Sequence, residues 1–159
     1  MSWFKSQSRR LNGFSRLAPS DRVIAIKALA LMPAISLALR FAGFVRVVRW
    51  LKLRHGESRL VNDRSAQLVR ARHLSGIVEK IVRHGVGDRS CLRSSLALWY
   101  LLGVEGIAAE VRIGVKREPI APFEAHAWVE VQGLPLNDAP DIGDRFKPFS
   151  DLSRALEAC

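Results

Sequence analysis

The chain has 159 residues, which suits one domain, or one domain with an arm, and excludes two full domains. Apolar residues make up 48% and charged residues 25%, ordinary globular values that exclude a wholly disordered chain. The formal net charge is +10, and it is unevenly placed: residues 1–60 hold 12 basic and 2 acidic side chains, whereas residues 61–159 hold 13 of each. We therefore expect a basic helical arm over residues 1–58, joined to a neutral body over residues 59–159.

The first apolar segment begins after a Pro-Ser-Asp sequence at residues 19–21, where the serine or the aspartate is suited to cap a helix. Residues 23–39 then form an apolar run of 17 residues, the lower limit for crossing a bilayer. Lys27 lies inside this run and would cost roughly 2.5–3.5 kcal/mol at the centre of a spanning helix. We therefore expect a soluble, cytoplasmic chain in which Pro33 divides or bends this helix.

Three more helices are expected in the first two thirds of the chain. Apolar residues recur at helical spacing over 41–51, which indicates one apolar stripe. A longer helix is expected over 58–83, where Glu79 and Arg83 lie one turn apart and are suited to pair. The helix from Cys91 to about residue 102 is apolar nearly all round, which favours burial.

The pattern changes after residue 106. Residues 109–115 and 127–131 alternate with period two, which predicts two strands. Gln132-Gly133 is a turn signal, and residues 134–138 are expected to return as a short strand. Helices followed by an antiparallel meander give an α+β fold class, with the helical part N-terminal to the sheet.

Cys91 is the strongest single candidate for chemistry. It stands at the expected N-terminus of a buried helix, where unpaired backbone N–H groups and the positive helix end favour thiolate over thiol. The alternative is a small buried core residue, which is the usual fate of a lone cysteine. The two cysteines of the chain, Cys91 and Cys159, lack the repeated Cys/His pairs of a structural zinc site.

His126 and Asp138 are the candidates for supporting roles. His126 opens an apolar strand between two alanines, so it could act as a general base toward the cysteine, or be a satisfied core histidine. Asp138 follows 12 residues later, beyond the turn, where two paired strands bring it beside the imidazole. The alternative for Asp138 is a turn aspartate. The remaining histidines lie on basic helix surfaces that we expect to be exposed, and each is either a histidine satisfied by neighbouring groups or simply solvated: His55, His73 and His84.

At these residues the sequence resembles the lasso-peptide leader peptidases, transglutaminase-like cysteine peptidases that form the catalytic half of the lasso-peptide B protein. The resemblance is close over about residues 85–140. It rests on five strings in order: the one that begins at Cys91, Gly106-Ile107-Ala108-Ala109, Val111-Arg112-Ile113-Gly114-Val115, Phe123-Glu124-Ala125-His126-Ala127-Trp128-Val129-Glu130 and Leu136-Asn137-Asp138. One departure is that the family motif has a basic residue three positions after the cysteine, where this chain has Ser94, with Arg93 one position earlier.

The resemblance implies a transglutaminase/papain-like core over residues 59–159, with a catalytic helix packed on an antiparallel sheet. It implies that Cys91 is the nucleophile, His126 the general base and acid, and Asp138 the orienting acid. The implied activity is removal of the leader peptide from a lasso-peptide precursor, with no cofactor and no metal. The implied partners are the precursor leader, a separate leader-recognition protein and a lasso cyclase.

Two alternatives stay open. One is a different acyl or amide transfer on the same fold. The other is a non-enzymatic binding module whose basic arm contacts phosphates. Because the arm has a wide apolar stripe and few aromatic residues, we expect it to pack onto the body or onto a partner. All the excess positive charge lies in residues 1–60, so we expect the arm to attract an acidic partner, the leader bound to its recognition protein and not nucleic acid. Weak contact of residues 40–54 with an anionic membrane surface is also compatible with this composition.

Overall fold

The computed structural model describes residues 18–55, 63–84, 90–117 and 124–149. A helical part comes first and a four-stranded antiparallel sheet follows, so the expected α+β class is confirmed. The helices are α2 (Pro19–Ala42), α3 (Phe44–Lys52), α4 (Arg64–His84), α5 (Cys91–Val104) and α6 (Ile142–Arg145). The strands are β1 (Glu110–Lys116), β2 (Ala125–Val131), β3 (Leu134–Pro135) and β4 (Phe146–Pro148).

Helix α2 differs from the expectation at its N-terminus, and of the two outcomes expected at Pro33, a division or a bend, it does not show the division. Neither residue 20 nor residue 21 caps it, because the N-cap is Ala18 and no side chain bonds to the first turn. Asp21 is instead buried and accepts a hydrogen bond from His73 on α4 at 2.9 Å. The helix also continues through Pro33 without division. Proline has no backbone N–H, so the carbonyl four residues before Pro33 has no donor within the helix. That carbonyl lies on an exposed side of the helix, where water can donate to it.

The prediction of a single apolar stripe over residues 41–51 is wrong in part. Gly43 adopts a φ of 78°, a left-handed conformation that glycine takes without strain, and it separates α2 from α3. After this break Val48 and Leu51 are buried, whereas Phe41 is 76% exposed. The stripe is therefore split between the core and the surface.

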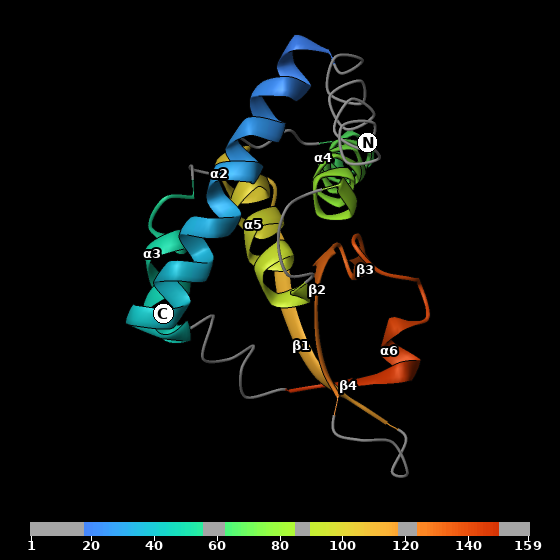
Figure 1. Ribbon diagram of the computed structural model, residues 1–159. Helices are drawn as coiled ribbons and strands as arrows, with labels where there is room; N and C mark the ends of the chain where they lie inside the picture. The colour runs from blue at the N-terminus through green and yellow to red at the C-terminus, as the bar shows by residue number, and fades with distance from the viewer. Residues whose placement is uncertain (1–17, 56–62, 85–89, 118–123, 150–159) are drawn as a thin grey trace, which may run out of the picture.

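Helices α4 and α5 follow the prediction closely. Glu79 and Arg83 pair at 2.7 Å along α4, as expected. Helix α5 is buried along most of its length, with Leu96, Leu98 and Leu102 fully enclosed. It lies between α2 and the sheet, with α4 against another side (Figure 1). The first residues of the expected helix over 58–83 fall partly outside the described residues.

The sheet has the strand order β3-β2-β1-β4, with all neighbours antiparallel. In the central pair Gly114 lies opposite His126, and Ile113 lies opposite Ala127. Strand β3 stops at Pro135, shorter than the expected strand over 134–138. Helix α6 and strand β4 were not predicted. Strand β4 pairs with the end of β1 and is therefore one of the two edge strands of the sheet.

One apolar core joins the helices to the sheet. It contains side chains from α2, α3, α4 and α5 together with Val129 and Val131 of β2. A smaller cluster of Trp128, Ile142 and Phe146 lies beside it. Helices α2 and α3 thus pack onto the body of the protein. The division proposed at residue 58 lies outside the described residues.

Candidate active site

Cys91 is the first residue of α5, and its side chain is partly exposed. The N-cap residue Ser90 makes no side-chain hydrogen bond to the first turn, so the backbone N–H groups there are not all satisfied within the helix. The backbone amides of Leu92 and Ala127 both lower the pKa of the Cys91 thiol. The helix N-terminus and these donors favour a negative charge on the sulfur.

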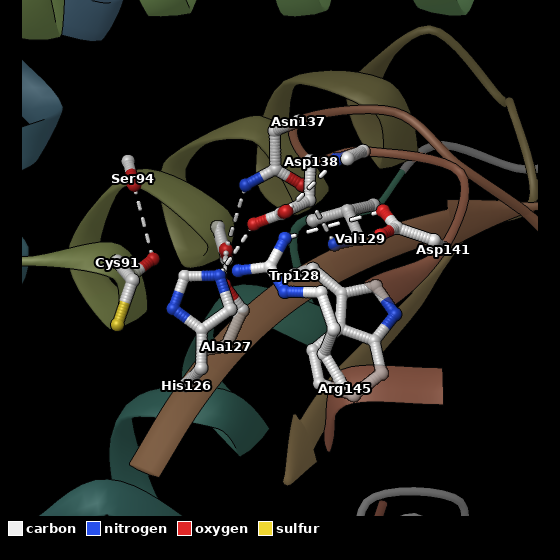
Figure 2. A network of polar contacts seen from close by, with 12 residues as sticks. Cys91, Ser94, His126, Ala127, Trp128, Val129, Asn137, Asp138, Asp141 and Arg145 are labelled. Atoms are coloured by element: carbon white, nitrogen blue, oxygen red, sulfur yellow. Dashed lines mark hydrogen bonds and ion pairs between the residues drawn. The ribbon is translucent and has the colours of Figure 1, made fainter. Parts of the chain in front are cut away.

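His126 lies between the cysteine and the aspartate. Its Nε2 atom is 2.5 Å from Oδ2 of Asp138, and the opposite edge of the ring is turned toward Cys91 (Figure 2). The Cys91 side chain and the ring are close enough for each to shift the pKa of the other. The structure therefore brings together the three residues singled out in the sequence, in the order thiol, imidazole, carboxylate.

These contacts change the ionisation of the pair. The hydrogen bond from His126 lowers the pKa of the Cys91 thiol, and the amides of Ala127 and Leu92 act in the same direction against the opposing effect of burial. The pKa of His126 is raised to about 9, first by its bond to Cys91 and then by Asp138. A charged imidazolium donates from both ring nitrogens, which suits a ring placed between two anions.

A buried polar network holds Asp138 in place after strand pairing has ended. The side chain of Asn137 accepts a hydrogen bond from the backbone N–H of Val129 at 2.8 Å and donates to Oγ of Ser95 at 3.0 Å. Ser95, which is fully buried on α5, donates in turn to the carbonyl of Ala127 at 3.0 Å. This network joins α5, β2 and the segment carrying Asp138, so it fixes the three site residues relative to one another.

The same segment is held from α4 as well. The hydroxyl of Ser75 donates to the carbonyl of Leu136 at 3.1 Å, and the Leu136 N–H donates to the carbonyl of Val129 at 2.9 Å. The Ala139 N–H donates to Oδ1 of Asp138 at 2.8 Å. One carboxylate oxygen is thus held by the backbone, and the other is presented to the imidazole.

Aromatic rings lie against the imidazole. Trp128 is stacked beside His126 with ring centroids 6.4 Å apart, and Phe146 lies 5.1 Å away. The indole of Trp128 is fully buried and donates to Glu130 at 2.8 Å, and Arg112 donates to the other oxygen of that carboxylate at 3.1 Å. Trp128 and Glu130 of the His-Ala-Trp-Val-Glu string thus have structural roles next to the site.

Several charged residues lie away from this centre. Arg93 points to α2 and donates to Oγ of Ser36 at 2.7 Å, so it joins two helices. Asp141 and Asp144 are exposed, and Asp141 faces Arg145 at 4.0 Å.

Two other histidines, His55 and His73, make contacts elsewhere in the protein. His73 is bonded to Asp21, with about half of its side chain exposed. The expectation of an exposed His55 is wrong: its ring lies 4.4 Å from that of Trp99, and Nε2 is buried without a partner. Burial lowers the pKa of His55. The side chain of His84 lies outside those that the structure describes.

Sequence reasoning missed Ser95, Asn137 and Phe146. Asn137 and Ser95 stood inside the strings that carried the resemblance, and an amide directly before a candidate aspartate was the one available signal. Phe146 belongs to a three-residue strand with no alternation to detect.

Among the described residues, no group of three or more His, Cys, Asp or Glu side chains is arranged to hold a metal ion. The arrangement that is present suits nucleophilic chemistry. A thiolate at a helix N-terminus, an imidazole that gives and takes a proton, and a carboxylate that orients the imidazole suffice for acyl transfer to sulfur.

Comparison with known proteins agrees with this geometry. The chain is 33% identical over 97 residues to the microcin J25-processing protein McjB of Escherichia coli, a match that covers 60% of this chain and 44% of that protein. The chain thus matches less than half of that relative's length. No solved structure gave a significant match. The profile of the transglutaminase-like superfamily matches residues 34–151, which include Cys91, His126 and Asp138. The chain belongs to the transglutaminase-like superfamily.

Proposed function

We propose that the chain is a cysteine peptidase that removes the leader peptide from a lasso-peptide precursor. The observation that carries the proposal is the Cys91 thiol at the start of α5, with the His126 imidazole turned toward it and the Nε2 of that imidazole bound to Asp138 (Figure 2). The similarity to a microcin J25-processing protein supports a peptide precursor as the substrate.

In the proposed first step the Cys91 thiolate attacks the carbonyl carbon of the peptide bond at the end of the leader. The carbonyl oxygen becomes an oxyanion, and backbone N–H groups at the start of α5 are the donors nearest to it. As the C–N bond breaks, the His126 imidazolium gives a proton to the departing amine. The products of this step are a leader thioester on Cys91 and a core peptide with a free amine.

In the second step a water molecule attacks the thioester carbonyl. Neutral His126 takes a proton from this water, the C–S bond breaks, and the leader leaves with a new carboxylate. Asp138 stabilises the imidazolium and fixes the direction of its ring in both steps. The freed core amine is the group that a separate cyclase would join to a side-chain carboxylate.

The alternative on the same fold is transfer of the acyl group to an amine. Both reactions share the thioester on Cys91, so they differ only in what releases it. The same contacts around Cys91 would serve either reaction, and the product alone separates the two.

The proposal is tested by incubating the purified chain with a candidate precursor peptide and a candidate leader-recognition protein, both sought among the genes that flank its own. Mass spectrometry should show leader and core fragments with the wild-type chain and uncut precursor with Cys91→Ala. A Cys159→Ser variant is the matched thiol control and should cut normally; Cys159 lies outside the described residues. Normal cleavage by Cys91→Ala would refute the proposed mechanism.

A further inference from the structure

Helix α2 is apolar on the side that faces away from the core. Its buried residues Ile24, Ala28 and Ile35 pack inward. Opposite them, at spacings of three and four residues, runs a row of exposed side chains that we call the outer stripe: Val23, Ile26, Ala30, Pro33, Leu37 and Phe41. Several are strongly exposed, including Leu37 at 60% and Phe41 at 76%. With 24 residues, α2 is roughly 36 Å long.

Cations border the outer stripe, and no exposed acid accompanies them within residues 18–55. Lys27 and Arg40 lie on opposite flanks of the stripe and are exposed. Helix α3, which follows directly after Gly43, also exposes large apolar side chains, Val45 and Trp50. The basic side chains Arg46 and Arg49 are exposed on the same helix. The one acidic residue in this range, Asp21, is buried against His73.

We propose that the exposed side of α2 and α3 binds the surface of an anionic bilayer. Apolar side chains of a helix lying in the interface enter the boundary of the acyl chains, and lysine and arginine reach outward to anionic headgroups. A nucleic acid would pair with the cations but leave the apolar stripe in water. The surface of an anionic bilayer matches both the apolar stripe and the cations of this face.

The packing of α2 favours lying on the membrane over crossing it. By length and composition the helix could span a bilayer. Spanning would pull Ile24, Ala28 and Ile35 out of the core and break the bond between Asp21 and His73. A helix lying in the interface keeps all of these contacts and uses only its exposed side.

The test is co-sedimentation of the full chain with vesicles of phosphatidylcholine alone or mixed with phosphatidylglycerol. We expect binding to the anionic vesicles that weakens as salt is added, and little binding to the neutral ones. Replacing two stripe residues, Leu37→Ser with Phe41→Ser, should reduce partitioning about tenfold or more. Replacing Arg46 and Arg49 with glutamine should reduce it about fivefold per charge, on anionic vesicles only.

The matched control lies on α4. Val69 is 70% exposed and Arg72 is also exposed, so Val69→Ser with Arg72→Gln removes the same kinds of side chain away from this face. The control should bind vesicles as the wild type does, and all variants should melt normally because only exposed side chains change.

Three results would overturn the proposal. One is a wild-type chain that ignores anionic vesicles at low salt. The second is a control that loses as much binding as the stripe variant. The third is a stripe variant that still binds vesicles but no longer binds the leader with its recognition protein, because a protein partner would then occupy this face. None of these readouts depends on peptidase activity.

Discussion

Asn137 is predicted to position the site, and its removal should have a measurable cost. Asn137→Ala deletes the acceptor for the backbone N–H of Val129, a residue with no exposed surface, and the donor to Ser95. An unpaired buried N–H costs about 1–3 kcal/mol, and the lost bond to Ser95 adds to it. We expect a loss of about 2–3 kcal/mol in the free energy of unfolding. For a chain of this size that lowers the melting temperature by roughly 5–10 °C.

A double-mutant cycle with Ser95→Ala isolates the network, with thermal unfolding as the assay. Because Asn137 and Ser95 share a hydrogen bond, the double variant should lose less stability than the sum of the two single variants, by about 0.5 kcal/mol or more. Ser94→Ala is the matched control, since the bonds of its hydroxyl within the described part of the chain go to the carbonyls of Ser90 and Cys91 in its own helix turn. It should change stability by less than about 0.5 kcal/mol.

Activity gives a second readout that simple destabilisation would not move. With the protein still folded at the assay temperature, Asn137→Ala should lower kcat more than it raises KM, because Asp138 and the imidazole lose their fixed geometry. Strict additivity in the cycle, or an Asn137→Ala variant that melts at the wild-type temperature, would refute this role for Asn137.

Three other predictions follow from the site. Alkylation of Cys91 by iodoacetamide should titrate with a midpoint below the ~8.5 of a free thiol, and His126→Ala should move it upward, because the imidazole lowers the pKa of the thiol. The pKa of His126 is raised to about 9, so its contribution to stability is complete below its ordinary value near 6.5 and is lost as pH rises through about 9. The difference in unfolding free energy between wild type and His126→Ala, measured in urea, should shrink over that window. Gly114→Ala should destabilise by about 1–3 kcal/mol in the same assay, since its Cβ would lie 2.7 Å from the Lys147 carbonyl.

The parts of the fold that the sequence predicted are those set by local periodicity. Helix α5 is apolar on all sides and is buried, and β2 alternates and lies inside the sheet. The proximity of His126 and Asp138 also followed from the turn at Gln132-Gly133. The reason given for that proximity was incomplete, because strand pairing ends at Pro135 and the side chain of Asn137 replaces it.

What the sequence did not predict depends on residues distant along the chain. Asp21 has the chemistry of a helix cap, but His73 lies 52 positions away and binds its carboxylate. His55 follows basic residues, which suggested solvation, yet Trp99 of another helix covers its ring. Strand β4 contains only three residues and one proline, and it exists because β1 offers an edge at Gly114. Such pairings become visible only in three dimensions.

The most direct test of the central claim is cleavage of the precursor in water enriched in the heavy isotope oxygen-18. The proposed hydrolysis of a thioester on Cys91 predicts that the leader fragment gains one heavy oxygen in its new carboxylate, and that Cys91→Ala yields no leader at all. The same reaction with an added primary amine should still release mainly the free acid. A leader fragment that carries the amine would show transfer instead of hydrolysis, and heavy-oxygen leader released by Cys91→Ala would contradict the account.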